Sequence, residues 1–400
     1  MTTLLTHTAT ARNTHIDLLR GVAILLVLLL HFALAFGLGN SPVGDLLGKK
    51  LLGAILWNGN YGVTMFFVIS GYLITSNALA RFGSLQAIDW RAFYVMRFAR
   101  IFPSLLLALA IIVPLGCLDV PFFNNSDDGH VFPASFFVLA AGSVLTFWHN
   151  VLMANVGWFN YCLNVYWSLS VEEVFYLVFP LACVALKSQR KIVALCCVFI
   201  ALAPLYRYQN AGNELLFECG YLACFDAIAF GCLAALVAQR WRPLGRQGIL
   251  VRVLASIALV ATYLWGIRGH ESYGFTCIAV LTAVLLIATP QVQSIGKKLW
   301  LPTRVVGWLG RHSYELYLFH IIVLATMRNI TDRDNLSYAM RLPWLLVYLL
   351  ASALAAALVS RYLGEPMNRW IRSRWTWGQG LAASIPSPRG LVAENTRGGR

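Results

Sequence analysis

The sequence contains few charged residues for its length, and this shortage excludes most soluble proteins. Charged residues make up 12% of the 400 residues, whereas hydrophobic residues make up 59%. An average soluble domain carries about 25% charged residues. Apolar runs of about 20 residues, the length of a membrane-spanning helix, recur along almost the whole chain. The composition therefore predicts an integral membrane protein, an all-α polytopic helical bundle without a large soluble domain.

The sequence also lacks the cysteine patterns that hold metal ions or disulfide frameworks. Its nine cysteines are scattered, and none stands in a C-x-x-C or Cys/His metal-binding spacing. Several, such as Cys183 and Cys232, lie within apolar runs, where a free cysteine behaves as a small apolar residue. We predict no metal site and no permanently bound cofactor.

The net charge of +14 is distributed in short basic clusters between the apolar runs. Such clusters follow from membrane topology, because basic loops tend to stay on the cytoplasmic side. A nucleic-acid partner is therefore not expected. The same argument makes membrane lipids the surroundings of most of the chain.

The two ends of the chain differ from the rest. Residues 1–14 are polar and lead into the first apolar run without an A-x-A-like cleavage site, so we predict a cytoplasmic segment followed by a retained span. Residues 15–375 form the predicted membrane domain. Residues 376–400 are rich in Gly, Ser, Pro and Arg without periodicity, which is typical of a disordered tail.

Eleven apolar segments can be distinguished in the sequence. They lie near residues 16–36, 51–75, 101–118, 134–148, 165–185, 191–206, 219–238, 250–267, 273–290, 305–327 and 342–362. If all eleven crossed the membrane, the basic loops around Lys187, Arg240 and Lys297 would lie outside. If segment 134–148 enters and returns without crossing, every basic cluster becomes cytoplasmic. We predict about ten spans, one re-entrant or non-crossing segment, and both termini in the cytoplasm.

The first apolar run contains ionisable residues that the hydrocarbon disfavours. An arginine at the centre of a membrane helix costs about 2.5 to 3.5 kcal/mol, so Arg20 and His31 suggest a functional site. They are eleven residues apart, close to three helical turns, and so share one face of the helix. A histidine at mid-depth can take a proton from a hydroxyl group and return it, or it can simply bond a neighbouring helix. We predict that both residues face an internal reaction cavity.

Two arginines, Arg97 and Arg100, stand in "RFARIFP" at the cytoplasmic start of the third apolar run. Residues three apart lie on one face of a helix, and two guanidinium groups there can clamp phosphate groups. The same pair is also typical of a topology anchor at a membrane edge. We predict that Arg97 and Arg100 bind a phosphate-bearing donor, with Arg91 as an additional contact.

Polar residues also interrupt the aromatic segment "YWSLSVEEVFYLVFP", residues 166–180. Ser168 and Glu172 are four residues apart, which predicts a hydrogen-bonded pair on the cavity side. Glu172 and Glu173 point about 100° apart, so one of them is expected to face inward. The alternative is a structural ion pair with another helix. We assign Ser168 and Glu172 to the reaction and Glu173 and Trp167 to the substrate cavity.

Further polar residues occur in "RHSYELYLFH" and "YLACFDAIAFGCLAAL". Glu315, Tyr317 and His320 are candidates for the lining of the substrate cavity, although each could also be a buried partner of an arginine. For Asp226 we favour the role of a buried partner. The glycines of "YGVTMFFVISGYLIT" are expected to allow close approach of helices.

In their order along the chain, seven segments resemble the membrane-bound acyltransferase-3 family of bacterial O-acetylation enzymes. The family acts on surface polysaccharides, peptidoglycan, nodulation factors and macrolides, and the resemblance covers residues 12–372. The segments are "RGVAILLVLLLH", "FFVISGYLI", "RFARIFP", "YWSLSVEEVFYLVFP", "FDAIAFG", "SYELYLFH" and "GEPMNRW".

The resemblance implies transfer of an acyl group, commonly acetyl from cytoplasmic acetyl-CoA, to a hydroxyl of a glycan or lipid-linked sugar. It also implies a multi-pass protein of the bacterial inner membrane. The family's motifs fall on Arg20 and His31 (Arg-x10-His), on Arg97 and Arg100 (Arg-x-x-Arg), and on Trp167, Ser168 and Glu172 or Glu173 (Trp-Ser-Leu…Glu). Some relatives carry an additional soluble esterase domain, and we expect none in this chain.

These observations combine into one hypothesis. The phosphates of CoA bind Arg97 and Arg100, and His31 either removes the proton of the acceptor hydroxyl or briefly carries the acyl group. Arg20 and Glu172 balance the charge of the site and hold the imidazole tautomer. The rival hypothesis is a proton-coupled transporter or a flippase of a sugar or sugar-lipid, which also needs polar residues at mid-depth but consumes no CoA thioester.

Overall fold

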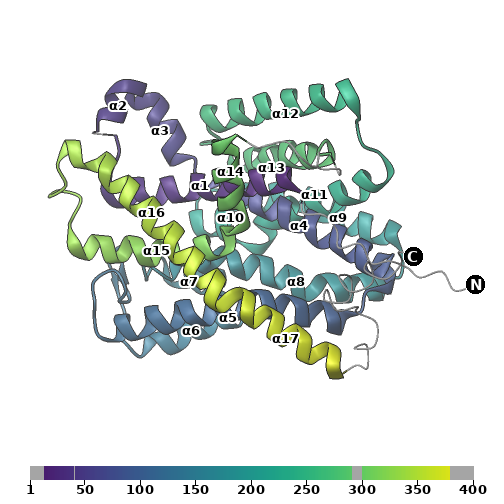
Figure 1. The fold of residues 1–400 in the computed structure, drawn as a ribbon, viewed down its shortest axis with the longest axis horizontal. Coiled ribbons are helices and arrows are strands. Elements are labelled where there is room, and N and C mark those ends of the chain that lie inside the picture. The colour runs from purple at the N-terminus through teal and green to yellow at the C-terminus, as the bar shows by residue number, and fades with distance from the viewer. Residues whose placement is uncertain (1–12, 40, 291–299, 379–400) are drawn as a thin grey trace, which may run out of the picture.

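The computed structural model describes residues 13–39, 41–290 and 300–378. Most of these residues are helical (Figure 1). The predicted N-terminal segment up to residue 12 and residues 379–400 of the predicted tail lie outside the described residues. The α-helices are α1 (Thr14–Phe36), α2 (Pro42–Leu47), α3 (Lys49–Trp57), α4 (Tyr61–Phe82), α5 (Trp90–Cys117), α6 (Phe136–Leu145), α7 (His149–Val156), α8 (Trp167–Leu186), α9 (Gln189–Gln209), α10 (Glu214–Cys219), α11 (Tyr221–Arg240), α12 (Gly245–Trp265), α13 (Glu271–Ile287), α14 (Leu301–Arg311), α15 (Ser313–Ile330), α16 (Arg341–Val359) and α17 (Glu365–Gly378).

Short elements join some of these helices. The strands β1 (Ser126–Asp127) and β2 (His130–Val131) form a small antiparallel hairpin between α5 and α6. A π-helical turn, Ser360–Gly364, joins α16 and α17 into one long rod. The remaining short elements are the 3₁₀ turns Leu85–Ala87, Asn164–Tyr166 and Tyr338–Met340.

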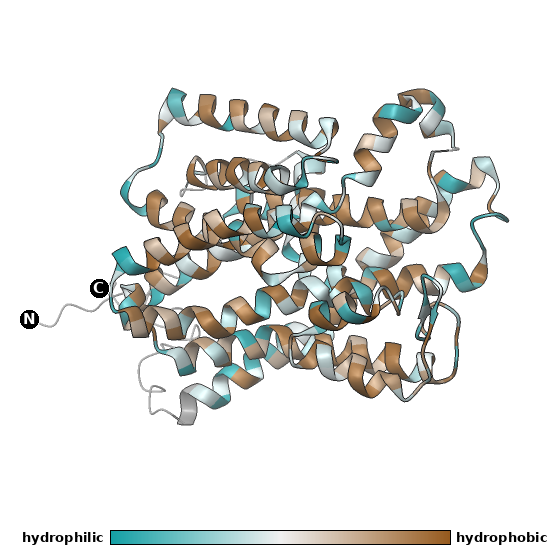
Figure 2. Ribbon diagram, turned by 180° about the vertical axis from the view of Figure 1, so that it is seen from behind, coloured by the Kyte–Doolittle hydropathy of each residue, from teal (hydrophilic) through white to brown (hydrophobic). Residues whose placement is uncertain are grey.

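Eight helical segments are long and apolar enough to cross a membrane, which confirms the predicted polytopic membrane bundle. Two further helices in the bundle, α13 and α15, are shorter or less apolar and occupy the places of the two remaining predicted spans. Figure 2 shows hydrophobic residues along the long helices and hydrophilic residues gathered in many of the connections. The eight segments are Thr14–Phe36, Lys49–Phe82, Trp90–Cys117, Asn164–Leu186, Gln189–Gln209, Glu214–Arg240, Gly245–Trp265 and Tyr338–Trp375.

Helix α1 shows how the local sequence sets the ends of a span. Asn13 caps its start, where the side-chain oxygen accepts a hydrogen bond of 3.0 Å from the backbone N–H of His15. Gly37 ends it with a φ of 66°, a conformation that favours glycine. The 23 residues between them make a helix of about 34 Å, long enough for a hydrocarbon core of about 30 Å.

Contacts between helices show the direction in which each span runs. Phe67 and Ser70 of α4 contact, in the same order, Trp167 and Tyr176 of α8, so these two helices are parallel. Helix α5 follows α4 after a short loop and returns antiparallel to it. The chain between α5 and α8 must therefore leave and re-enter the bundle on the same side.

Helix α6, in the segment predicted not to cross, lies in this connection. Its 10 residues span only about 15 Å, half the thickness of the hydrocarbon core. Its length and the parallel arrangement of α4 and α8 both agree with the predicted non-crossing segment. A helix is tolerated there because its backbone groups bond one another.

The apolar segment 305–327, counted above as one span, is divided into two helices in the structure. The chain breaks at His312 into α14, which stands upright among the long helices in Figure 1, and α15. Helix α14 crosses α1 closely at two glycines. A Cβ atom on Gly310 would lie 1.7 Å from the Asp17 carbonyl oxygen, and one on Gly21 would lie 1.9 Å from that of Val306. Because α14 is packed against α1 in this way and the chain breaks at its end, α15 begins inside the bundle.

The predicted role of the glycines in α4 is confirmed. A Cβ atom on Gly71 would lie 2.1 Å from the carbonyl oxygen of Ile228, and one on Gly231 of α11 would lie 2.0 Å from that of Val68. The two glycines thus allow the backbones of α4 and α11 to touch. Close backbone approach through small residues is a main source of helix association in membranes.

The predicted pairing of Asp226 with an arginine is also confirmed. Arg207 of α9 bonds Asp226 of α11 at 2.7 Å, and each side chain is only 1% exposed. Thr276 of α13 donates to the same carboxylate at 2.6 Å, and the Ser272 carbonyl accepts from Arg207 at 3.1 Å. Since its hydrogen bonds are satisfied, this buried pair joins three helices.

All nine cysteines are free. Six are buried, in line with their interpretation as small apolar residues, but Cys117, Cys197 and Cys277 are exposed on the surface of the bundle.

We expect the predicted topology to be visible by cysteine labelling. In a background without native cysteines, Ser188→Cys, between α8 and α9, should react with a membrane-impermeant maleimide only after the cells are opened. Asp128→Cys, in the hairpin loop, should react in intact cells, because the two positions lie at opposite ends of α8. Labelling of Ser188→Cys in intact cells would contradict the orientation.

We expect Gly71→Ala to destabilise the protein, because its new Cβ would meet the backbone of α11 and not a flexible side chain. Overpacking of this kind typically costs about 1 to 3 kcal/mol. Thermal unfolding in detergent should show a lower midpoint. Gly212→Ala is the matched control, since its Cβ would meet nothing within 4 Å; equal midpoints for both variants would show that α4 and α11 can separate freely.

Candidate active site

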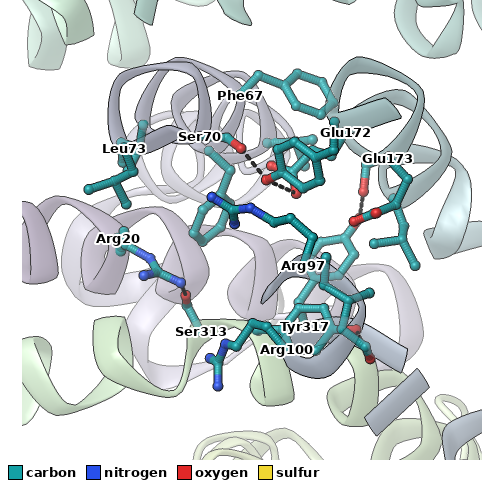
Figure 3. Close-up of a pocket in the computed structure, with 18 residues that line it drawn as sticks. Arg20, Phe67, Ser70, Leu73, Arg97, Arg100, Glu172, Glu173, Ser313 and Tyr317 are labelled. Atoms are coloured by element: carbon teal, nitrogen blue, oxygen red, sulfur yellow. Dashed lines mark hydrogen bonds between the residues drawn. The ribbon is translucent and has the colours of Figure 1, made fainter. Parts of the chain in front are cut away.

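A cavity of about 170 Å³ lies between α1, α4, α5, α8 and α15 (Figure 3). It brings together seven residues that the sequence predicted for the site: Arg20, Arg97, Arg100, Ser168, Glu172, Glu173 and Tyr317. The other lining residues are Val63, Phe66, Phe67, Ile69, Ser70, Leu73, Ile101, Leu169, Tyr176, Ser313 and Tyr314. Residues from five helices thus form one partly polar chamber inside an apolar bundle.

Three arginines line this cavity, Arg20 from α1 and Arg97 and Arg100 from α5. Arg20 donates a hydrogen bond of 2.8 Å to the hydroxyl of Ser313 at the start of α15. The Arg97 guanidinium lies 4.7 Å from the centre of the Tyr176 ring, a cation–π contact. Figure 3 shows the three arginines among the residues that line the cavity, with the Arg97 and Arg100 side chains pointing in different directions. This arrangement can bind a group that carries several negative charges.

Arg100 has an additional, deeper partner. Its guanidinium bonds the carboxylate of Glu315 at 3.1 Å and lies 5.6 Å from the centre of the Tyr314 ring. The Glu315 side chain is completely buried, whereas that of Arg100 is 32% exposed. Two roles were open for Glu315, and the structure shows the second: it does not line the cavity but is the buried partner of Arg100 and holds its guanidinium from behind.

Arg91 does not belong to this group of arginines. It lies at the exposed start of α5, with its guanidinium 5.0 Å from the centre of the Trp90 ring. It does not line the cavity. The expectation that it would add to the donor site is not met in this structure, because it stands two helical turns before Arg97 and Arg100.

The carboxylates of α8 face the arginines across the cavity. Both Glu172 and Glu173 line it, although only one was expected to face inward. Tyr176 donates a long hydrogen bond of 3.4 Å to Glu172 and is itself hydrogen-bonded to Ser70 of α4. The relay from Ser70 to Glu172 is drawn with dashed lines in Figure 3.

The predicted hydrogen bond between Ser168 and Glu172 was wrong. Ser168 instead bonds the hydroxyl of Tyr317 at 2.6 Å, and that hydroxyl donates to the carbonyl of Val165 at 2.7 Å. The serine and the tyrosine therefore form a hydrogen-bonded wall between α8 and α15. Trp167, predicted for the cavity, does not line it and packs against Phe67, with ring centres 6.1 Å apart.

His31 was predicted to share the cavity with Arg20, and the structure places it elsewhere. Its imidazole contacts that of His320 on α15, with ring centres 4.9 Å apart and planes at 68°. Neither histidine lines the cavity, so His320 also departs from its predicted place. Tyr317, which does line it, has its ring centre 5.9 Å from that of His320. The histidine pair thus lies behind the wall of the cavity.

The expected common face of Arg20 and His31 is nevertheless observed. Both contact α15, Arg20 through Ser313 and His31 through His320. Because the contacts follow the same order along both helices, α1 and α15 are parallel. The cavity and the histidine pair therefore lie one after the other along the contact between α1 and α15.

Several cavity residues were missed by the sequence analysis. Tyr176 stands four residues after Glu172, and that spacing could have indicated it. Ser70 stands beside a glycine in an apolar helix and gave no such signal. Tyr314 stands three residues before Tyr317 on the same face of α15, so its spacing could also have indicated it, whereas Ser313 gave no such signal.

Among the described residues, no group of three or more His, Cys, Asp or Glu side chains is placed to hold a metal ion. The cavity offers guanidinium, carboxylate and hydroxyl groups. It can thus bind a polar or anionic molecule by hydrogen bonds and charge.

Comparisons with known proteins show which family the chain matches. The family model for the acyltransferase domain matches residues 13–361. O-acetyltransferase OatA of Staphylococcus aureus (strain NCTC 8325 / PS 47) is 24% identical over 340 residues, 78% of this chain and 53% of that protein. Peptidoglycan O-acetyltransferase OatA of Listeria monocytogenes is 24% identical over 375 residues, 88% of this chain and 55% of that protein.

A third relative is the putative peptidoglycan O-acetyltransferase YrhL of Bacillus subtilis, which is 26% identical over 292 residues, 67% of this chain and 45% of that protein. No solved structure gives a significant match. The chain spans about half the length of the curated relatives it matches. Since the family model covers residues 13–361 and nearly the whole helical bundle, the chain belongs to the acyltransferase-3 family of membrane proteins.

Proposed function

We propose that the protein is an O-acyltransferase of the bacterial cytoplasmic membrane. It moves an acyl group from cytoplasmic acyl-CoA to a hydroxyl of a glycan or lipid-linked sugar, and acetyl is the acyl group that we propose. Family membership and the names of the three relatives support O-acetyl transfer. Two of those names specify peptidoglycan, which makes a cell-envelope glycan the proposed acceptor.

The observation that carries the proposal for the donor is the group of three guanidiniums in one cavity. Arg20, Arg97 and Arg100 all line this cavity and supply several hydrogen-bond donors to it. CoA carries phosphate groups, and arginine binds phosphate in a bidentate, charge-assisted way. Glu315 holds Arg100 from behind at 3.1 Å, so its side chain is positioned before the donor arrives.

His31 is the proposed catalytic base. Its Nδ1 lies 2.8 Å from the Val27 carbonyl oxygen, which can only accept, so Nδ1 carries the proton and Nε2 the lone pair. Nε2 takes the proton of the acceptor hydroxyl while the oxygen attacks the thioester carbon. The C–S bond then breaks, and the proton passes to the CoA sulfur, which leaves as a thiol.

The wall between the cavity and the histidine pair has to admit the thioester. Ser168 and Tyr317 form that wall through a single hydrogen bond of 2.6 Å. A donor bound by the arginines would reach His31 by displacing this bond.

Release of CoA distinguishes this proposal from the transporter hypothesis. Purified protein in nanodiscs is incubated with radiolabelled acetyl-CoA and membranes of a host strain that lacks the chain. The proposal requires free CoA to appear together with label in the glycan fraction. A carrier or flippase would leave the thioester intact.

We expect His31→Ala to abolish transfer, because it removes the nitrogen that takes the proton of the acceptor hydroxyl in the proposed reaction. Initial rates with radiolabelled acetyl-CoA should fall at least 100-fold, with unchanged yield and size-exclusion profile. His270→Ala, at the exposed start of α13, is the matched control and should retain full activity. Retention of a tenth of the activity by His31→Ala would exclude His31 from the chemistry.

We expect Arg100→Ala to raise the KM for acetyl-CoA about 10-fold with a smaller change in kcat, because it removes a charge-assisted bond to the donor. Steady-state kinetics at saturating acceptor measures both constants. Arg91→Ala, outside the cavity on the same helix, is the control and should leave KM unchanged. Arg100→Ala also leaves the buried Glu315 carboxylate without its partner. The double variant Arg100→Ala/Glu315→Gln removes that unpaired charge, so any increase in KM that remains is due to lost donor binding. If the double variant regains the original KM, Arg100 does not bind the donor.

A further inference from the structure

The contact between His31 and His320 contains two imidazoles with the same tautomer. In His320, Nδ1 lies 2.8 Å from the Tyr317 carbonyl oxygen and 3.1 Å from that of Leu316. A carbonyl can only accept, so this nitrogen carries the proton, as it does in His31 with Val27. In both rings the lone pair is consequently on Nε2.

The Nε2 lone pair of His320 accepts no hydrogen bond from the described part of the protein. Its side chain is completely buried, and among the described residues no protein group hydrogen-bonds to its Nε2 atom. Unpaired polar atoms in a buried place are rare in native proteins and usually have a functional reason. His31 lies beside it and is partly accessible, and no protein group among the described residues bonds its Nε2 either.

We propose that the two Nε2 atoms form a two-point binding site for the acceptor, with His320 as its second residue. This inference rests on the proposed function. The hydroxyl that is acylated donates to Nε2 of His31 and loses its proton there, and a neighbouring hydrogen-bond donor of the same molecule donates to Nε2 of His320. Neighbouring hydroxyl groups on a sugar ring meet this requirement, whereas a monohydric alcohol does not.

The position of the pair supports a role on the acceptor side. Tyr317 separates it from the arginine-lined cavity, and the ring centres of Tyr317 and His320 are 5.9 Å apart. Phosphate-binding groups and hydroxyl-binding groups thus lie on the two sides of one tyrosine. The donor and the acceptor can then approach from opposite sides of the wall that Ser168 and Tyr317 form.

The test compares two substitutions at His320 in the full-length protein in nanodiscs. His320→Leu removes the accepting nitrogen, and we expect the KM for the acceptor in host membranes to rise about 10- to 100-fold while the KM for acetyl-CoA stays the same. His320→Gln keeps an accepting oxygen and should recover most of that loss. His270→Leu is the control for replacing a histidine elsewhere.

Two kinds of result at His320 would contradict the inference. It fails if His320→Leu leaves the KM for the acceptor within threefold of the original, or if His320→Leu and His320→Gln lower kcat, donor affinity and thermal stability alike, as a purely structural residue would. If the unsubstituted protein transfers nothing, the proposed function fails as well. The ring arrangement remains testable in that case: ¹⁵N NMR of histidine-labelled protein should show an unprotonated Nε2 in His320, and a proton on that atom would overturn the two-point site.

Discussion

The contact between α1 and α15 is the interaction on which the candidate site depends. Hydrocarbon excludes ionisable groups, so Arg20 and His31 are tolerated on a membrane helix only where another helix covers them. Helix α15 provides this cover by starting inside the bundle and running parallel to α1. Its first turn meets Arg20, and its third turn meets His31. A cavity and a pair of imidazoles thus lie on one helix–helix contact.

Three further features hold the surrounding helices in place. Gly21 and Gly310 let α14 cross α1 at backbone distance, which sets the point where α15 begins. On the other side of the bundle, Gly71 and Gly231 lock α4 to α11, and the buried Arg207–Asp226 pair ties α11 to α9 and α13. The cavity is lined by α4 as well as by α1 and α15, so its shape depends on these backbone contacts. Rigid scaffolding of this kind is what positions catalytic groups.

The arrangement also separates two chemical tasks. In the proposed reaction the arginines bind the anionic donor, and the histidine pair, behind Tyr317, binds hydroxyl groups of the acceptor. Part of this division could be predicted. Arg97 and Arg100 were recognised by their spacing of three residues, and Glu172 by its place in an apolar helix. The buried Asp226 and the close approach at Gly71 were predicted for the same reason, since each stands out within an apolar sequence.

The sequence by itself determined the membrane class and most of the polar residues of the cavity, and it predicted the non-crossing segment. Periodicity and the cost of charge in lipid are local properties, and they can be read along one helix. Only the tertiary structure decided which polar residues meet: that Ser168 bonds Tyr317 and not Glu172, that Glu315 stands behind Arg100, and that His31 faces His320 outside the cavity. These pairings join residues up to 289 positions apart, and they follow from the break at His312 and from backbone contacts at glycines, which helical periodicity does not reveal.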